Sequence, residues 1–341
     1  AMIALVDAGL PPDDEALQRA ARWTLAEEVR ARGDWSVRRP QVPVGGWAFE
    51  FENDNYPDVD DTAEVVLALR RIVPEEPAAA AEAVQRAIAW TQGMASKDGA
   101  WGAFDADNAR KILYELPFCD FGAVIDPPSA DVTAHVVEML AQEETADPAV
   151  LAAGVDWLLA AQEEDGAWFG RWGVNYLYGV GAAVPALVAA GVDPDEPPIR
   201  RAIEFLEVHQ NDDGGWGEDI RSYDDPLLRA QGASTASQTA WALFALIAAG
   251  HARSAAARRG VAWLAATQLA DGNWDEPWYT GTGFPGDFYL NYHLYRLVFP
   301  LSALGRWCRA IEEASAAAGT RTEAAHQAHA ARNSRRAKVG R

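Results

Sequence analysis

The stretch QEEDGAW at residues 162–168 contains the pattern Gln-x3-Gly-x-Trp, which occurs twice more in the chain. The other two copies run from Gln210 to Trp216 and from Gln268 to Trp274. An aromatic residue stands eleven positions before the Trp of each copy. Recurrence of one pattern in this way is the signature of a repeat architecture, in which one supersecondary unit is used several times.

Two weaker copies precede these three. The segment from Trp90 to Trp101 keeps the spacing but has Ala95 where the Gln belongs, and the Gly-Asp-Trp that ends at Trp35, after Trp23, is the weakest copy. In each copy a helix is expected to end at the Gln, and the Gly allows a turn that folds the Trp back over that end. The Gln side chain can then bond the unpaired backbone groups of the helix end. We interpret the repeat Trp residues as structural staples at the outer turns, away from any substrate.

The spacing of apolar residues predicts the fold class. They recur at intervals of three and four through most of the chain, while alternation with a period of two is sparse. The connections are rich in Gly, Pro and Asp. We predict an all-α fold, a closed α/α barrel of concentric helices over residues 1–315, with short strands at most. Helices are predicted at residues 14–30, 60–72, 79–94, 131–142, 148–161, 176–190, 198–208, 235–249, 255–267 and 297–312.

The composition is that of a folded and strongly acidic chain. Of the 341 residues, 49% are apolar and 23% are charged, and the net charge of −21 argues against nucleic acid as a partner. Residues 316–341 are instead basic, and we predict a disordered tail there. Cys119 and Cys308 are too few for a disulfide framework, which suggests a reducing compartment. Because Ala1 precedes the first Met and no signal pattern follows, we expect an internal segment of a longer chain.

Three carboxylates stand within four residues where a predicted helix begins. Asp58, Asp60 and Asp61 precede an apolar helix that starts at Thr62. One Asp there would be explained by capping of the helix N-terminus. Three exceed that need, and like charges so close together cannot all ionise cheaply. At least one should hold its proton to a higher pH, which makes the cluster a candidate proton donor.

A second segment, DPPSADVTAH at residues 126–135, places Asp131 and His135 four residues apart on one face of a helix. A lone His on such a helix is more often a structural residue. Beside the Asp cluster it could instead bond to the donor Asp as an imidazolium. That contact would make the Asp a stronger acid, as protonation of an alkene requires.

The third segment, residues 281–295, is rich in aromatic residues. Its GTGFPG is formally a dinucleotide fingerprint, but no strand or parallel sheet is predicted around it, so we discount that interpretation. Aromatic residues at 284, 288, 292 and 295 are spaced for one face of a helix or an irregular turn. Core packing explains them by default. The functional alternative is an electron-rich wall that stabilises a carbocation without trapping it.

Together these segments resemble a known family. The shared features are DVDDTA at 58–63, the Gln-x3-Gly-x-Trp repeats, DPPSADVTAH at 126–135, WFGRWGVNYLYG at 168–179 and GTGFPGDFYLNYHLYRLVFP at 281–300. In these motifs the chain is similar to bacterial squalene-hopene cyclases, relatives of the oxidosqualene cyclases. The resemblance runs from about residue 1 to residue 310. It covers the C-terminal half of such an enzyme, whose two α/α-barrel domains enclose a cavity between them.

The resemblance implies a class II terpene cyclase. Such an isomerase converts squalene to hopene- and hopanol-type pentacyclic triterpenes by protonating a terminal alkene, also acts as a lyase toward the hydrated product, and needs no cofactor or metal. By position in the motifs, Asp60 is the implied catalytic acid, Asp58 and Asp61 flank it, and His135 and Asp131 tune or reload it. Relatives can carry Tyr at position 104, where this chain has Phe. The implied substrate-binding residues are Phe49, Phe104, Trp172, Tyr178, Phe284, Phe288, Tyr292 and Tyr295.

The resemblance also implies partners and a location. The substrate would be squalene or a related polyprene, and the working enzyme would include an N-terminal barrel domain that this chain lacks. The full-length enzyme is expected to contact the cytoplasmic side of the bacterial membrane peripherally, and a homodimer is a further option. The apolar docking helix of the family lies in the other half, so this segment could by itself be soluble.

Three other interpretations stay open on the sequence. Asp60, Asp61 and Glu64 also fit a DDxxE magnesium motif of class I prenyl diphosphate enzymes, although no second metal motif appears. An α/α-barrel glycosidase would use paired carboxylates as well. The chain could also be a folded but inactive helical domain without its N-terminal half.

Overall fold

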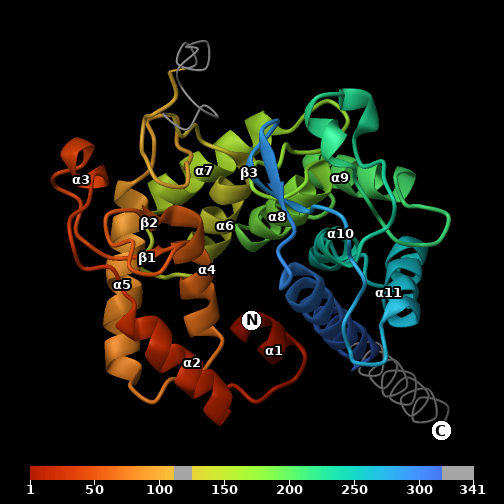
Figure 1. Cartoon of the computed structure of the whole chain (residues 1–341), viewed down its shortest axis with the longest axis horizontal. Helices are drawn as coiled ribbons and strands as arrows, with labels where there is room; N and C mark the ends of the chain where they lie inside the picture. Colours follow the sequence, from red (N-terminus) through yellow and green to blue (C-terminus); the bar gives the residue numbers. More distant parts are fainter. Residues whose placement is uncertain (111–124, 317–341) are drawn as a thin grey trace, which may run out of the picture.

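A computed structural model describes residues 1–110 and 125–316, which form a mostly helical ring (Figure 1). Two antiparallel hairpins accompany the helices, β1 (Trp47–Ala48) with β2 (Pro57–Asp58) and β3 (Gly281–Phe284) with β4 (Phe288–Leu290). The 3₁₀ turns are η3 (Ile220–Tyr223) and η4 (Pro226–Leu228). The α-helices are α1 (Met2–Asp7), α2 (Glu15–Ala26), α3 (Trp35–Arg38), α4 (Val59–Arg70), α5 (Pro77–Gly93), α6 (Ala130–Ala141), α7 (Pro148–Ala161), α8 (Tyr176–Ala189), α9 (Pro197–Val208), α10 (Ala236–Ala248), α11 (Ala255–Thr267) and a last helix over residues 295–316.

The helices alternate between an inner and an outer layer. In the inner layer α4 packs on α6, α6 on α8 and α8 on α10. In the outer layer α5, α7, α9 and α11 each pack on the inner helix that precedes them in the chain. Figure 1 shows the inner helices arranged around a common centre, with α1 and the last helix completing the ring. The prediction of an α/α barrel with concentric helices is therefore confirmed.

Asp7 on α1 closes the ring. Its carboxylate accepts hydrogen bonds from Ser302 and Arg306 of the last helix, at 2.6 and 2.8 Å, and from Arg71 after α4, at 2.9 Å. Arg309 adds a fourth contact at 3.1 Å. A buried carboxylate needs such partners because its charge is otherwise very costly to desolvate. The two ends of the described chain are thus held together through one side chain.

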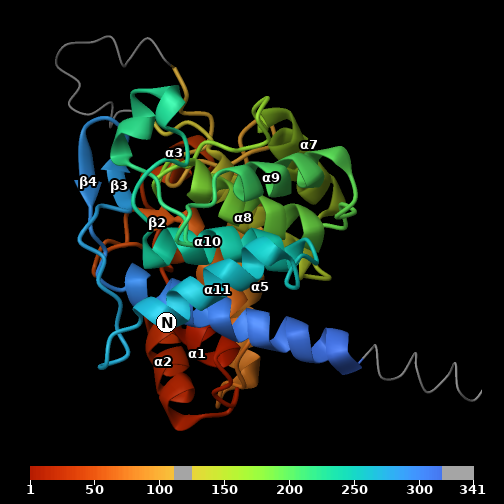
Figure 2. The ribbon, with the colours of Figure 1, turned by 90° about the vertical axis from the view of Figure 1, so that its right-hand side faces the viewer.

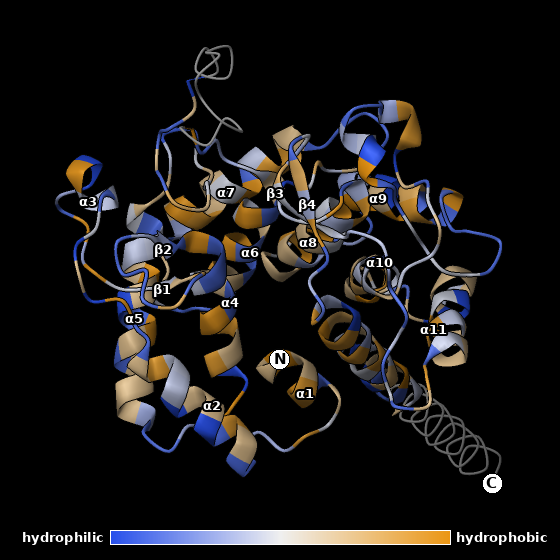
Figure 3. Cartoon of the chain, in the orientation of Figure 1, coloured by the Kyte–Doolittle hydropathy of each residue, from blue (hydrophilic) through white to orange (hydrophobic). Residues whose placement is uncertain are grey.

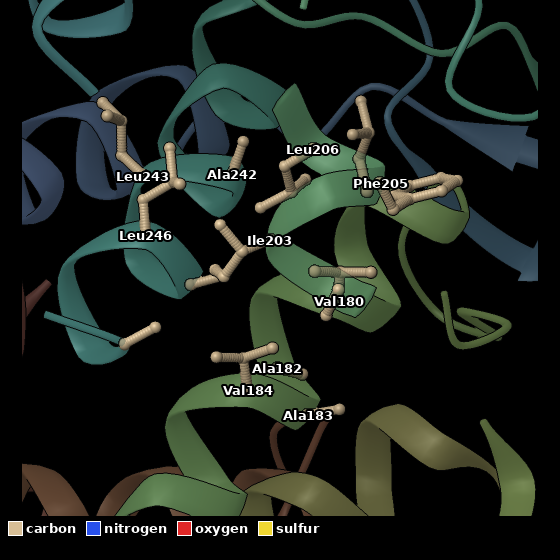
Figure 4. Close-up of a cluster of buried hydrophobic side chains, with 14 of the residues drawn as sticks. Val180, Ala182, Ala183, Val184, Ile203, Phe205, Leu206, Ala242, Leu243 and Leu246 are labelled. Carbon is tan, nitrogen blue, oxygen red and sulfur yellow. The ribbon is translucent and has the colours of Figure 1, made fainter. Parts of the chain in front are cut away.

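The inner layer is apolar and closely packed. Residues 176–187 of α8 are all buried, and Figure 3 shows α6 and α8 as predominantly hydrophobic beside more hydrophilic loops. Gly181 allows α8 to approach α10, since a Cβ at this position would lie 2.8 Å from Cβ of Trp241. Figure 4 shows the core where α8, α9 and α10 meet, with Val184, Ile203 and Leu246 among its side chains.

In four copies the repeat Trp binds the end of the helix before it, as predicted. The indole Nε1 donates to the carbonyl ten residues earlier in four copies: Trp101 to Thr91, Trp168 to Leu158, Trp216 to Leu206 and Trp274 to Leu264, at 2.7 to 2.9 Å. The Gln side chains were expected to bond the helix end and do not; each amide donates to the carbonyl of the Gly in its own motif. That Gly has a positive φ in every copy, from 85° to 97°, a conformation that favours glycine. These Trp residues are buried at outer turns and do not line the central cavity described below.

The weakest copy of the repeat was predicted to end at Trp35, and that prediction is wrong. Trp35 is buried but its Nε1 has no hydrogen-bond partner within residues 1–110 and 125–316. Trp47 takes the expected place, because its Nε1 donates to the carbonyl of Thr24 at 2.7 Å. Thr24 directly follows the aromatic Trp23, as the acceptors in the other copies follow theirs. An insertion between Trp23 and Trp47 hides this copy from a search at fixed spacing.

The predicted helices agree closely with the observed ones. The ten predicted spans correspond to α2, α4 to α11 and the last helix, with bounds that differ mostly by one or two residues. The short helices α1 and α3 were not predicted. Within the described residues no helix is both long and apolar enough to cross a membrane. The basic tail predicted at residues 316–341 lies outside the described residues except for residue 316. Cys119 also lies outside them. Cys308 is an exposed free thiol.

Candidate active site

A cavity of about 290 Å³ lies at the centre of the ring. Its wall combines acidic side chains from α4 and α6 with aromatic rings from α8, α10 and the last helix. Such a mixture of a few polar groups in an apolar cavity is typical of small-molecule sites. The lining residues include Asp60, Asp61 and Glu64 from α4, His135 and Glu138 from α6, Tyr178 from α8, Trp241 and Phe244 from α10, and Tyr295, Phe299 and Arg306 from the last helix.

Asp58 holds the start of α4 in place. Its Oδ1 accepts the backbone N–H groups of Asp60 and Asp61 at 2.7 and 3.2 Å, so it is the N-cap of the helix. Pairing of β1 with β2 fixes Asp58 opposite Trp47. Burial and the nearby charges of Asp61 and Asp60 raise the pKa of Asp58 well above its usual value. The capping explanation therefore accounts for the position of Asp58 and leaves the other two carboxyls in the cavity.

Asp61 keeps its proton up to about pH 7. Burial, followed by the charges of Asp60 and Glu64, raises the pKa of Asp61 to about 7. This agrees with the argument from like charges, that at least one carboxyl of the cluster holds its proton to a higher pH.

Asp60 and His135 are hydrogen-bonded across the cavity wall. Nδ1 of His135 lies 2.5 Å from Oδ1 of Asp60, and the two residues come from α4 and α6. Burial lowers the pKa of His135, but the charge of Asp60 and this hydrogen bond outweigh it and raise the pKa to about 10. The imidazole is then an imidazolium at neutral pH, so Nδ1 donates to Asp60.

Asp131 is buried on α6 but is not hydrogen-bonded to His135 among the described residues. Its Oδ2 accepts the backbone N–H groups of Arg171 and Trp172 at 2.9 and 2.8 Å. Its Oδ1 accepts from the Ser129 hydroxyl at 2.5 Å. Asp131 therefore anchors the loop that carries Trp172. Its charge adds to the groups that raise the pKa of His135, behind the larger effect of Asp60.

The predicted aromatic residues form two rows. Tyr178 contacts Trp241, and from there the first row continues through Tyr295 and Tyr292 to Phe49, with ring centroids 4.8 to 6.5 Å apart. The second row runs from Phe104 through Trp172 and Phe284 to Phe288, with separations of 5.7 to 6.5 Å. Tyr178 and Tyr295 line the central cavity itself. The other six predicted residues extend the aromatic surface beyond it.

Residues 284, 288, 292 and 295 do not lie on one face of a helix. Phe284 and Phe288 are paired across the β3–β4 hairpin, and the last helix begins only at residue 295. The GTGFPG segment is the first strand and turn of this two-stranded hairpin, so its rejection as a dinucleotide site agrees with the structure. Figure 2 shows the hairpin at one end of the ring.

Several cavity residues were missed from the sequence. Glu64 and Glu138 follow Asp60 and His135 by one helical turn, a signal that could have identified them. Burial raises the pKa of Glu64, against the opposing charge of His135. Trp241 and Phe299 lie within apolar helix patterns that are the same as those of a packed core, and no sequence signal separates them.

The acid cluster also carries the DDxxE pattern of a metal site. Within the described residues, no group of three or more His, Cys, Asp and Glu is arranged to hold a metal ion. Asp60, the first residue of the DDxxE pattern, is instead bonded to His135.

Solved structures give the class of this fold. MstE from Scytonema, a type II terpene cyclase, superposes with a TM-score of 0.59 at 16% identity, over 91% of this chain and 87% of that chain. The ent-copalyl diphosphate synthase from Streptomyces platensis superposes with a TM-score of 0.58 at 20% identity, over 90% of this chain and 49% of that chain. The helical ring is therefore the fold of the type II terpene cyclases.

Sequence comparison gives the family. The family model of the squalene-hopene cyclase C-terminal domain matches residues 1–309, and the chain belongs to this family. It is 55% identical to the squalene-hopene cyclase of Alicyclobacillus acidocaldarius, over 92% of this chain and 50% of the relative. It is 46% identical to that of Zymomonas mobilis, over 89% and 47%. The dammaradiene synthase of Dryopteris crassirhizoma is 42% identical over 89% and 48%. The chain spans about half the length of these relatives.

Proposed function

We propose that this chain supplies the acid and part of the cavity wall of a class II triterpene cyclase that acts on squalene or a related polyprene. The observation that supports it most is the Asp60–His135 hydrogen bond in a cavity lined by aromatic rings. Family membership and the known activity named for its relatives favour squalene, with hopene- or hopanol-type pentacyclic products.

The proton comes from Asp60 in this proposal. In the resting site the charge of Asp60 holds His135 as an imidazolium. The proposal places the proton to be transferred on Oδ2 of Asp60, while Oδ1 keeps the hydrogen bond from Nδ1 of His135. The adjacent positive charge makes the carboxylic acid stronger, and it stabilises the carboxylate that remains after transfer. The proton adds to the terminal alkene, whose π electrons form the new C–H bond and leave a tertiary carbocation. Asp61, neutral below about pH 7, adds no negative charge that would oppose the transfer.

The aromatic rows carry the next steps. Each ring closure moves the positive charge to a new carbon, and electron-rich ring faces stabilise it without offering a nucleophile. Phe49 and Phe288 are 59% and 39% exposed in this chain, so a cavity for a long polyprene needs further cover at that end. We propose that the preceding half of the full-length protein provides it.

The remaining partner assignments are also proposals. We propose that contact with the cytoplasmic face of the membrane is made through that preceding half and is peripheral. A homodimer stays a prediction, and we propose no surface for its interface.

The test is incubation of the full-length protein with squalene, with product analysis by mass spectrometry, in EDTA and in Mg²⁺. Pentacyclic product formed equally in both supports the proposal. Turnover only of a prenyl diphosphate, and only with Mg²⁺, would favour the class I alternative. The same assay on this chain alone tests whether it is inactive without its preceding half.

A further inference from the structure

Tyr223 on η3 adjoins the loop and the hairpin that carry the second aromatic row. It does not line the central cavity, and nothing in the proposed function uses it. The segment that contains η3 is fixed to the start of α8, because the carboxylate of Glu218 accepts the backbone N–H groups of Asn175 and Leu177 at 3.2 and 3.0 Å. The side chain of Asn175 also donates to Oγ of Ser222 at 3.3 Å. Tyr223 is therefore held on a well-anchored base.

The hydroxyl of Tyr223 bonds the loop that carries Trp172. Its Oη lies 2.8 Å from the carbonyl oxygen of Gly170 and 2.9 Å from that of Gly173, so its one hydrogen is shared between two acceptors. Both glycines are buried. The carboxylate of Asp131 holds the N–H groups of the two residues between them. The backbone that carries Trp172 is thus gripped by its carbonyls as well as by its N–H groups.

The ring of Tyr223 contacts the β3–β4 hairpin. It is stacked on Tyr289 of β4, with ring centroids 5.9 Å apart and an angle of 28° between the planes. Oη of Tyr289 accepts the backbone N–H of Gly286 at 3.1 Å, in the turn that joins Phe284 to Phe288. Tyr223 therefore supports the hairpin at the strand that carries Phe288.

The loop and the hairpin are also bonded directly to each other. The backbone N–H of Thr282 donates to the carbonyl of Trp172 at 3.1 Å, and that of Val174 donates to the carbonyl of Thr280 at 2.9 Å. Three of the four rings in the second row thus stand on one hydrogen-bonded backbone unit. Tyr223 contacts this unit at two points, the loop through its hydroxyl and the hairpin through its ring.

We propose that Tyr223 is a positioning residue for the second aromatic row, which holds Trp172 and the β3–β4 hairpin where their rings face the carbocations. This inference rests on the proposed function. A ring stabilises a cation through its face and at close range, so a displacement of about 1 Å weakens the contact. A cation with less stabilisation loses a proton from the neighbouring carbon to water. The C–H electron pair then forms an alkene, and the cascade ends early.

The first test compares Tyr223→Phe with the wild type in the full-length protein. The change keeps the ring and removes the donor to the carbonyls of Gly170 and Gly173. We expect the share of partly cyclised products to rise about two- to fivefold. Trp216→Phe is the matched control, because it also removes a buried donor to a carbonyl, but at an outer turn. It should lower stability and leave the product ratio unchanged.

Tyr289→Leu tests the contact with the hairpin separately. Tyr289 is only partly buried, so the protein should still fold if Tyr223→Phe does not. The change removes the stacked ring and leaves the hydroxyl of Tyr223 in place. The share of partly cyclised products should rise in this variant as well.

A further measurement does not depend on turnover. With fluorotryptophan incorporated into the full-length protein, the fluorine NMR resonance of Trp172 is identified by its loss in Trp172→Phe. This resonance should shift in Tyr223→Phe, because the loop moves, and should stay in place in Trp216→Phe.

Unchanged product ratios in Tyr223→Phe and Tyr289→Leu, or an unmoved Trp172 resonance in Tyr223→Phe, would overturn the inference. An equal rise of partly cyclised products in Trp216→Phe would also overturn it, because a general loss of stability would then be the cause. Wild-type protein that gives no cyclised product would overturn the proposed function itself. The Trp172 resonance would still test whether Tyr223 positions the loop.

Discussion

Asp60 and His135 are 75 residues apart in the chain, yet Oδ1 of Asp60 lies 2.5 Å from Nδ1 of His135 at the wall of the central cavity. The contact exists because α4 and α6 are neighbours in the inner layer, while the outer helix α5 lies between them in sequence. It gives Asp60 a cationic partner within a mainly apolar site. The predictions below test this acid, the walls around it and the ring that holds both.

Turnover should fall as the pH rises through about 7. Asp61 has a raised pKa of about 7, so it is neutral below that pH and negative above it. Its negative charge makes loss of the proton from Asp60 more costly, which slows the first step. The charge of Asp60 raises the pKa of His135 to about 10, so His135 does not produce a change near pH 7. In Asp61→Asn the fall near pH 7 should disappear from the pH profile of kcat, and an unchanged profile would remove Asp61 from this role.

Trp47→Phe should destabilise the protein by about 1 to 3 kcal/mol. The change removes the indole N–H and leaves the buried carbonyl of Thr24 without its donor. Trp168→Phe should cost a similar amount for the same reason, whereas Trp35 makes no such bond within the described residues. Urea unfolding measures all three variants. A larger loss for Trp35→Phe than for Trp47→Phe would contradict the assignment of Trp47 to the repeat.

Phe288→Ala should change the products more than the stability. Phe288 is 39% exposed, so its removal leaves only a small void in this chain. Loss of a cation contact of about 0.5 to 2 kcal/mol should stop part of the cascade early and give partly cyclised products at moderate conversion. Gas chromatography of the products decides. An unaltered product spectrum beside a lowered melting temperature would assign the ring to packing, and Phe284→Ala tests the neighbouring position in the same way.

Asp7→Ala should open the ring and cost about 3 to 5 kcal/mol, because it leaves Arg71, Arg306 and Arg309 without their shared partner. Burial raises the pKa of Asp7, but Arg306, Ser302 and Arg71 outweigh it and hold the pKa below the usual value. A lowered native pKa stabilises the fold above the unfolded value of about 4, and this stability is lost as the pH falls below it. The acid unfolding curve should therefore be shallower in Asp7→Ala. Equal acid sensitivity in variant and wild type would show that the network does not close the ring.

Local patterns were enough to predict the helices and the role of most repeat Trp residues. The spacing of apolar residues defines each helix, and Gln162, Gly166 and Trp168 act within one short segment. Trp47 was missed because its acceptor, Thr24, stands 23 residues away instead of ten. The pairing of Phe284 with Phe288 looked like a helix spacing because a tight hairpin also brings positions four apart together.

The site could be predicted only in part. The Asp cluster itself signals an acid, and the sequence offered a bond from His135 to it as one of two interpretations. Which of the two holds depends on how two distant helices pack, and the structure has His135 bonded to Asp60. Asp131 was expected to act on the acid, and the structure shows its Oδ2 bonded to the backbone of Arg171 and Trp172 and its Oδ1 to the Ser129 hydroxyl. Trp241 could not be found because an apolar helix pattern does not distinguish a residue that faces a cavity from one that faces the core.

The most direct test of the central claim is cyclisation of squalene by the full-length protein in D₂O, with the wild type and Asp60→Asn compared. The amide keeps the size of the acid but cannot donate an acidic proton. Asp156→Asn, an exposed change on α7, is the matched control. We predict one deuterium per product molecule, on the carbon of the terminal alkene that receives the proton, for the wild type and the control, and no cyclised product from a folded Asp60→Asn. Deuterated pentacyclic product from folded Asp60→Asn at a rate near that of the wild type would show that another group donates the proton.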